Sequence, residues 1–297
     1  MEIVEYNGWS RNVRLSNGEV ELIVTQDVGP RVLRFGFIGG PNLFVEMEGQ
    51  QGGAGELEWM IRGGHRLWLA PERKPLTYEL DNTAVEIEEI PHGVRTRQSP
   101  GPLSHVVKSM DVTLAPEANV VTVKHALTNR GEEAIELAPW ALSAMAAGGM
   151  AVIPLPEKIS HDAQLTHNQE WSLWGYTDLS DPRWLFGGKW VFFKQDAEKG
   201  PAKIGMAHRE GWVGYLLDDC LFVKRFEWVD GATYPDGGVN FETFSNETFL
   251  ELESLGPMTN LAPGESATHE ERWELHRDVP YVNTEGDADR YVRPLVS

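Results

Sequence analysis

Short runs in which hydrophobic and polar residues alternate recur along most of the chain. Val20, Leu22 and Val24 occupy alternate positions between Glu19 and Thr25, which is the two-residue period of a half-buried β-strand. The same period returns farther along the chain, at residues 85–87, 110–114, 121–127, 250–252 and 273–275. Clusters of glycine, proline and asparagine separate the runs. We therefore predict many short strands connected by turns.

No stretch shows a comparable helical period. The best helix candidate is the alanine-rich run 140–147, but Pro139 and the pair Gly148-Gly149 confine it to a length that a buried strand could also fill. The pattern leaves both conformations open there. Many strands with almost no helix predict an all-β fold, in which sheets pack face to face as a sandwich or close into a barrel.

A length of 297 residues fits one large domain or two ordinary ones. We see no shift in composition, no linker and no internal repeat, so we predict a single domain over residues 1–297. The segment 278–297 loses the alternating pattern, and we expect it to wrap the surface.

Composition and charge exclude several classes of partner. Lysine and arginine total 26 against 45 for aspartate and glutamate, which gives a formal net charge of −19. Such a surface repels nucleic acid and anionic lipid, so we predict no nucleic-acid or membrane partner. No apolar run is long enough to span a bilayer, and the start of the chain lacks the pattern of a secretory signal, so we expect a cytoplasmic protein. The single cysteine, Cys220, cannot form an internal disulfide.

Common catalytic and cofactor motifs are absent from the sequence. It contains no G-x-S-x-G elbow, the run 269–273 lacks the second histidine of a zinc-protease helix, and the glycines of 49–55 precede no phosphate-loop lysine. His161 and His167 lack a third ligand at a telling distance. We predict neither a metal nor any other cofactor.

The richest local signal is the run 62–72, with the sequence RGGHRLWLAPE. It places His65, Arg66 and Trp68 after a pair of glycines, which allow the backbone to approach a ligand closely. Histidine transfers protons near neutral pH, arginine donates several hydrogen bonds, and an indole face can stack on a sugar ring. The alternative is a surface ion pair between Arg66 and Glu72 beside a tryptophan of the core.

Carboxylates gather on a second pair of runs, 238–243 and 249–257. Glu251 and Glu253 are two residues apart, so both project to one face of a strand, and Glu242 joins them if the two runs form a hairpin. Such crowding either faces open solvent or lines a cleft, where one raised pKa would give a usable general base.

Aromatic residues are dense between positions 170 and 190, where four tryptophans stand among acidic residues and one arginine. Carbohydrate pockets combine such groups, because sugar C–H faces stack on rings while hydroxyls bind planar polar partners. A long connection folded over a sheet and anchored by its indoles would show the same composition.

Motifs at both ends of the chain resemble those of the galactose mutarotase-like superfamily. The runs 13–22 and 29–33 are similar to its first strands, and LESLGP at 252–257 with LAPGES at 261–266 is similar to the glutamate strand and following turn of aldose epimerases. GGHRLW at 63–68 and APWAL at 138–142 look like a bacterial branch of unknown function. The resemblance implies a supersandwich of large twisted antiparallel sheets.

The resemblance also implies a sugar in a concave cleft. The base glutamate of the family falls on Glu253, an early arginine on Arg31, and a substrate-side histidine on His65. The family places its acid histidine after the central T-N turn, here Thr128-Asn129, yet no histidine lies between Ala126 and Ser160. Either His65 is the acid, or a lysine or tyrosine replaces it, or only binding survives.

His125 precedes that turn, but it shares a face with apolar residues, so we interpret it as a core histidine.

From these observations we predict a carbohydrate-binding cleft. Glu253 and His65 are its candidate catalytic residues, and the candidate sugar-binding residues are Arg31, Arg66, Trp68, Trp140, Glu242 and Glu251. The leading hypothesis is an aldose epimerase-like isomerase acting on a neutral or cationic sugar. The alternative is a non-catalytic carbohydrate-binding or sensing protein. A third reading, a cleft for uronic-acid polymers, requires the arginines 31, 34, 62, 66 and 73 to cluster. The sequence does not indicate the oligomeric state.

Overall fold

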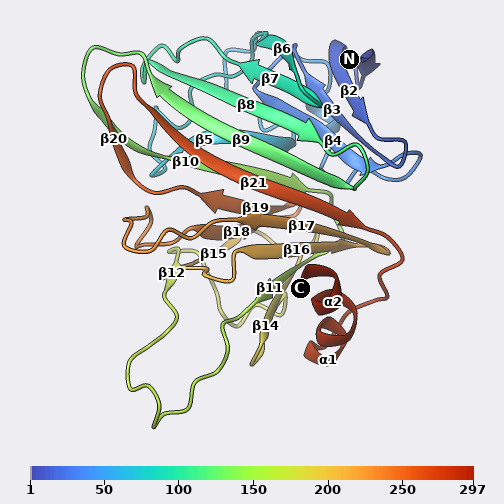
Figure 1. The fold of residues 1–297 in the computed structure, drawn as a ribbon, viewed down its shortest axis with the longest axis vertical. Helices are drawn as coiled ribbons and strands as arrows, with labels where there is room; N and C mark the ends of the chain where they lie inside the picture. Colours follow the sequence, from blue (N-terminus) through green and yellow to red (C-terminus); the bar gives the residue numbers. More distant parts are fainter. Residues whose placement is uncertain (1) are drawn as a thin grey trace.

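Two large antiparallel β-sheets make up most of the molecule (Figure 1). The computed structural model describes residues 2–297. The first sheet has eleven strands, in the order β1-β2-β3-β4-β5-β10-β19-β18-β15-β12 with β20 paired to β10. Its strands are β1 (Glu2–Tyr6), β2 (Trp9–Ser16), β3 (Val20–Thr25), β4 (Arg31–Phe37), β5 (Gly64–Ala70), β10 (Ile135–Met145), β12 (Trp171–Leu173), β15 (Ala202–Met206), β18 (Phe241–Ser245), β19 (Leu250–Leu255) and β20 (Thr259–Leu261).

The second sheet has ten strands, in the order β13-β14-β11-β16-β17-β21-β9-β8-β7-β6. Its strands are β6 (Glu86–Ile90), β7 (Gly93–Arg97), β8 (Val106–Leu114), β9 (Val120–Asn129), β11 (Met150–Pro154), β13 (Trp184–Phe186), β14 (Trp190–Lys194), β16 (Trp212–Leu217), β17 (Cys220–Phe226) and β21 (Ser266–His276). The all-β prediction is confirmed.

The alternating runs of the sequence become strands with one buried and one more open face. In β9 every second residue from Val121 to Asn129 is buried, and β21 shows the same alternation over most of its length. The inward residues of both sheets meet in one hydrophobic core. At its centre Trp273 lies 6.0 Å from Phe35 and 5.6 Å from Phe44, measured between ring centroids. Each such fully buried side chain stabilises the fold by roughly 1.5–3 kcal/mol.

The run 140–147, for which the pattern left two conformations open, forms the end of β10 and the turn after it. β10 pairs with β5 on one side and β19 on the other, and its residues from Leu137 to Met145 are all buried. A strand covered on both faces shows no alternation, because neither face meets water. This explains why periodicity could not distinguish it from a helix.

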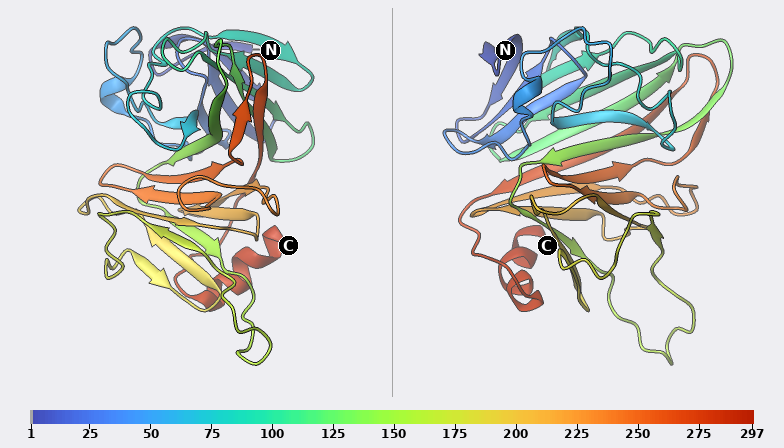
Figure 2. Two further views of the ribbon diagram at one scale, coloured as in Figure 1. Left: turned by 90° about the vertical axis from the view of Figure 1, so that its left-hand side faces the viewer. Right: turned by 180° about the vertical axis from the view of Figure 1, so that it is seen from behind.

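The C-terminal segment covers the outer face of the second sheet. It contains three short helical turns, α1 (Glu285–Asp287), η2 (Ala288–Val292) and α2 (Arg293–Val296), which lie beside β14 and β16 (Figures 1 and 2). Val292 and Val296 pack there in a cluster with Trp190 and Trp212. A further short turn, η1 (Glu48–Gln50), belongs to the long connection between β4 and β5. Within residues 2–297, no helix is long and apolar enough to span a membrane.

Candidate active site

Three neighbouring strands of the first sheet, β5, β10 and β19, carry polar side chains on both of their faces. The register sets Leu142 opposite Arg66 on one side and opposite Glu253 on the other, so these three side chains share one face. Ser143, one residue farther, is paired with His65 and Leu252 on the opposite face. We call the first the cavity face and the second, which faces the other sheet, the core face.

A cavity of about 450 Å³ lies on the cavity face. The connections before and after β5, the turn between β18 and β19, and Tyr176 form its other walls. Its lining residues are Met47, Trp59, Ile61, Arg66, Trp68, Glu72, Tyr78, Trp140, Leu142, Tyr176, Lys203, Phe244, Asn246, Thr248, Phe249, Glu251 and Glu253. A cavity of this size that combines aromatic walls with a few charged groups is typical of a small-molecule site.

Aromatic rings form one wall of the cavity. The Trp68 ring centroid lies 4.9 Å from that of Trp59, 5.0 Å from that of Tyr78 and 5.4 Å from that of Trp140. The indole nitrogens of Trp59 and Trp68 are buried and have no hydrogen-bond partner within residues 2–297. Buried N–H groups ordinarily have a partner, so a ligand or water is expected near this wall.

A lysine bridges two of the predicted glutamates. Lys203 of β15 places Nζ 2.9 Å from Oε2 of Glu253 and 2.6 Å from Oε2 of Glu242, and the Trp140 indole donates to the same Glu253 oxygen at 2.9 Å. Burial alone would lower the pKa of Lys203, but the two carboxylates outweigh it and raise that pKa. Burial raises the pKa of Glu242 well above its ordinary value, since one lysine cannot compensate two carboxylates.

Arg66 and Glu251 form the second charged pair of the cavity, with NH1 2.8 Å from Oε1. The guanidinium also lies 4.5 Å from the Trp68 ring and 5.5 Å from the Trp59 ring. Burial raises the pKa of Glu251, and Arg66 opposes that shift. The Glu251 side chain remains 8% exposed, so part of it is accessible.

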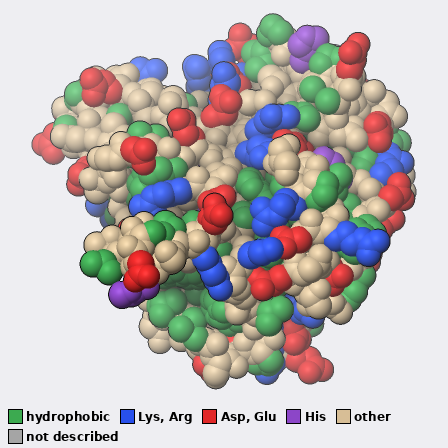
Figure 3. All heavy atoms as spheres, turned by 60° about the horizontal axis from the view of Figure 1, so that its bottom comes forward, with side chains coloured by type: hydrophobic (Ala, Val, Ile, Leu, Met, Phe, Trp, Pro, Cys, Tyr) green, Lys and Arg blue, Asp and Glu red, His purple; other side chains and the backbone are tan. Residues whose placement is uncertain are grey.

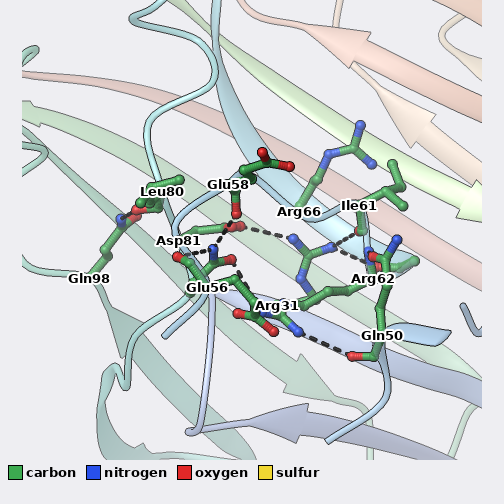
Figure 4. A network of polar contacts seen from close by, with 12 residues as sticks. Arg31, Gln50, Glu56, Glu58, Ile61, Arg62, Arg66, Leu80, Asp81 and Gln98 are labelled. Carbon is green, nitrogen blue, oxygen red and sulfur yellow. Dashed lines mark hydrogen bonds and ion pairs between the residues drawn. The ribbon is translucent and has the colours of Figure 1, made fainter. Parts of the chain in front are cut away.

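Arg31, which we predicted to bind sugar, does not line the cavity. It pairs with Arg66 across the strands, but its side chain is enclosed by the connection between β4 and β5 (Figure 4). Its guanidinium donates to the carbonyls of Ile61 and Gly63 and forms an ion pair with Asp81 at 2.8 Å. The network in Figure 4 holds this connection against the sheet. Arg31 therefore has a structural role, and its guanidinium does not face the cavity.

The arginine cluster needed for an acidic polymer is not assembled at the cavity. Arg62 forms an ion pair with Glu56 in the network of Figure 4, and Arg34 forms one with Glu21. Of the five arginines considered, only Arg66 lines the cavity. On the face drawn in Figure 3, basic side chains are interspersed with acidic ones.

His65, the predicted acid, lies on the core face, between the two sheets. It neighbours Arg66 in sequence, and consecutive residues of a strand project to opposite faces, so His65 points away from Glu253. It is fully buried, and burial holds its pKa well below the ordinary value. Within residues 2–297 no histidine lines the cavity.

His65 on the core face joins two residues of the second sheet, His125 and His269, in a hydrogen-bonded chain whose tautomers can be assigned. Nδ1 of His125 is 3.0 Å from the carbonyl of His269, so it carries the proton, and its Nε2 then accepts from Nε2 of His65 at 2.8 Å. Nδ1 of His65 accepts from the Ser143 hydroxyl at 2.9 Å. His125 is thus a hydrogen-bonded core histidine, as its alternation predicted.

The same hydrogen bonds decide whether these side chains could bind a metal ion. His65, His125 and Glu271 bring their ligand atoms within 4.8 Å of one another. Every ring nitrogen of the two histidines already has a partner, and Lys224 places its ammonium 2.8 Å from Glu271. The donor set does not fit a cation, because a metal would displace these bonds and meet a fixed positive charge.

The architecture of this chain, but not its sequence, matches known proteins. No family model matches the sequence, and no curated protein matches it. Solved structures do match: a galactose mutarotase-like protein from Lactobacillus casei has a TM-score of 0.60 at 10% identity, covering 89% of this chain and 100% of that one. The chain has the galactose mutarotase-like fold.

Two further structures with this mutarotase-like fold extend the likeness. A candidate aldose 1-epimerase from Escherichia coli K12 gives a TM-score of 0.60 at 14% identity, over 90% of this chain and 99% of the other. A galactose mutarotase related enzyme from Lactobacillus acidophilus gives 0.58 at 8% identity, over 92% and 100%. At these identities the likeness describes the backbone fold alone.

Several residues of the cavity were not singled out by the sequence. Lys203 lies far along the chain from the glutamates that it bridges, in a run with no distinctive motif. Trp59 comes from the connection between β4 and β5 and Tyr78 from the connection between β5 and β6, and only their aromatic character signalled them. The aromatic segment 170–190 does reach the site through Tyr176, and through Trp174, whose ring lies 4.8 Å from the Lys203 ammonium.

Proposed function

We propose that the protein binds a sugar in this cavity and acts on it as an aldose epimerase-like isomerase, with Glu253 as the general base. The observation that carries the proposal is the setting of Glu253. Its Oε2 is fixed by Lys203 and Trp140, while its Oε1 has no hydrogen-bond partner within residues 2–297, in the wall of an aromatic cavity. A fixed carboxylate with one unused oxygen is suited to accept the proton of a sugar hydroxyl.

The proposed reaction exchanges anomers through the open-chain sugar. Oε1 of Glu253 takes the proton of the anomeric hydroxyl, the bond between C1 and the ring oxygen breaks, and the ring oxygen takes a proton from an acid. The aldehyde rotates about the bond between C1 and C2. The reverse proton transfers then close the ring on the other face of the carbonyl, so protons and electrons balance without a co-reactant.

Glu251 is our candidate for the acid. It lies on the same face of β19 as Glu253 and lines the cavity, and burial raises its pKa, which favours the protonated form that a general acid requires. After it loses the proton, the carboxylate is stabilised by Arg66 at 2.8 Å. Two carboxyl groups whose surroundings differ can divide the roles of acid and base.

A second function, binding without catalysis, is favoured by a different observation. The Glu253 side chain is fully buried and already ion-paired, and the cavity contains no histidine within the part of the chain that the structure describes. A protein that senses or carries a sugar needs the aromatic wall and the charged pairs but no proton transfer.

The two functions are separated by measuring binding and turnover on the same variants. We would screen monosaccharides by thermal shift and follow anomer exchange on each hit by NMR. We expect Glu253→Gln to keep binding and lose the accelerated exchange, and Glu251→Gln to reduce exchange at least tenfold. Glu117→Gln, an exposed glutamate in the turn after β8, is the matched control. Binding with exchange at the uncatalysed rate in the unmodified protein would select the binding function, and no binding by any sugar would refute both.

A further inference from the structure

Carboxyl groups outnumber cationic groups at the cavity. Glu72, Glu251 and Glu253 line it, whereas Arg66 and Lys203 are the only lysine or arginine side chains among its lining residues. Glu242, paired with Glu253 in the register of β18 and β19, adds a further carboxyl group on the same face. The site therefore has an excess of acidic groups before any ligand enters.

Both cations are already engaged. Arg66 holds Glu251 at 2.8 Å, and Lys203 holds Glu253 at 2.9 Å and Glu242 at 2.6 Å. While Glu251 and Glu253 are ionised, a phosphate or carboxylate on a ligand would find no unpaired cation here and would have to disrupt one of these pairs, leaving a buried carboxylate uncompensated. The arrangement thus disfavours anionic sugars.

Glu72 is the lining carboxylate that lacks a cation. It is exposed, it accepts a hydrogen bond from the hydroxyl of Tyr78, and it makes no ion pair within residues 2–297. Deeper in the same cavity, Oε1 of the buried Glu253 has no hydrogen-bond partner within those residues either. Two acceptors at different depths are therefore left for a ligand's donors.

The aromatic wall already holds one ammonium group, that of Lys203. The ammonium of Lys203 lies 4.8 Å from the ring centroid of Trp140 and 4.8 Å from that of Trp174. Such contacts stabilise cations at aromatic faces. Burial raises the pKa values of Glu242 and Glu251, as expected where positive charge is scarce.

We propose that the cavity selects a sugar that carries a free amine, with Glu72 as the counter-ion of that amine. This inference rests on the proposed sugar site and narrows its ligand to the class of unphosphorylated amino sugars. The hydroxyls of such a sugar meet Glu253 and the aromatic wall, while the ammonium group supplies the missing positive charge at the carboxylates.

Glucose and glucosamine test the proposal, because they differ by one hydroxyl replaced by one amine. By calorimetry we expect glucosamine to bind about three- to fivefold more tightly than glucose below the pKa of its amine, and equally above that pKa, since one partly exposed ion pair gives an effect of this order. Added salt should reduce the difference. Glu72→Gln should remove most of the preference by weakening glucosamine binding more than glucose binding, and Glu117→Gln should change neither affinity.

The failures of the two proposals can be told apart. If glucose binds as tightly as glucosamine, or if glucuronate binds more tightly than either, the amine inference is overturned while the sugar site stands. A preference that survives in Glu72→Gln overturns the assignment of Glu72. If no sugar of any charge binds, the proposed function falls together with this inference.

Discussion

Similar ionic groups on the two sides of the first sheet are in opposite electrostatic states. On the cavity face, one lysine, Lys203, serves two carboxylates. On the other side, where the second sheet packs against the core face, one carboxylate of β21, Glu271, is surrounded by donors. Glu271 accepts from Lys224 at 2.8 Å, from the Ser254 hydroxyl at 2.5 Å and from the Trp273 indole at 2.7 Å. The carboxylates around Lys203 have too few hydrogen-bond donors, whereas Glu271 has a donor for both of its oxygens.

The pKa values follow this difference. Burial alone would raise the pKa of Glu271, but Lys224 and the neighbouring histidines hold it well below the ordinary value. On the cavity face the pKa values of Glu242 and Glu251 are raised instead. A buried charge that is fully satisfied contributes to structure, whereas groups left short of partners are those available to a ligand. We therefore propose that the chemistry takes place on the cavity face and that the groups between the sheets support the fold.

The largest expected effect comes from removing the core lysine. Lys224→Met leaves Glu271 buried without its counter-charge, and we expect the free energy of unfolding to fall by about 3–5 kcal/mol. Urea denaturation measures the change. A loss below about 1 kcal/mol would show that the core pair is not the satisfied, structural one that the comparison requires.

The equivalent change on the cavity face should cost less. In Lys203→Met, Glu242 can take up a proton and Glu253 keeps the Trp140 indole, so we expect a loss of about 1–3 kcal/mol. Sugar affinity, measured by calorimetry, should fall in this variant. If Lys203→Met proved as destabilising as Lys224→Met, the two faces would not differ in the way described.

Interrupting the histidine chain should affect stability alone. His125→Phe removes the acceptor of the His65 N–H and leaves that group buried without a partner, which should cost about 1–3 kcal/mol in unfolding free energy. Under conditions in which the variant is fully folded, its sugar affinity should equal that of the unmodified protein. A change in affinity larger than about threefold would contradict the separation of the faces.

The smallest expected effect is a difference in pH dependence. Because the folded-state pKa of Glu242 is raised, its protonated form favours folding below the unfolded pKa of about 4.3, and that contribution is lost as the pH rises toward the folded value. Glu242→Gln should therefore gain stability relative to the unmodified protein as the pH increases from 4 to 7. Glu271 has the opposite sign, since its stabilising contribution is present above its unfolded pKa and is lost in acid. Denaturation midpoints across this range measure both trends, and parallel curves would contradict the assignment of Glu242.

Alternation in the sequence was sufficient to predict the fold class and to place Glu251 and Glu253 on one face. It could not decide which other segments cover that face. Arg31 shares the face with Arg66, but whether its side chain is open depends on a connection folding over it, and that contact arises between residues distant in sequence. For the same reason Lys203, 50 positions from Glu253, had no signal of its own.

His65 fell on the opposite face for a simpler reason. The motif was interpreted as a cluster in which a histidine and an arginine act together, but in an extended strand neighbours point apart. Applied to residues 64–70, the alternation used elsewhere would have separated His65 from Arg66 and Trp68. The run 64–70 is a regular strand, although the glycine pair at its start is more typical of a turn or loop.

The strict alternation of β5 also limits how this chain can be compared or lengthened. An alignment that is shifted by one position across residues 64–70 exchanges the core histidine with the cavity arginine, and so transfers a proton donor to the wrong side of the sheet. An insertion of one residue in β5 would do the same physically, driving a guanidinium into the space between Trp273 and His125. A single substitution in this strand therefore tests one side chain. A one-residue insertion or gap moves every following side chain to the opposite face.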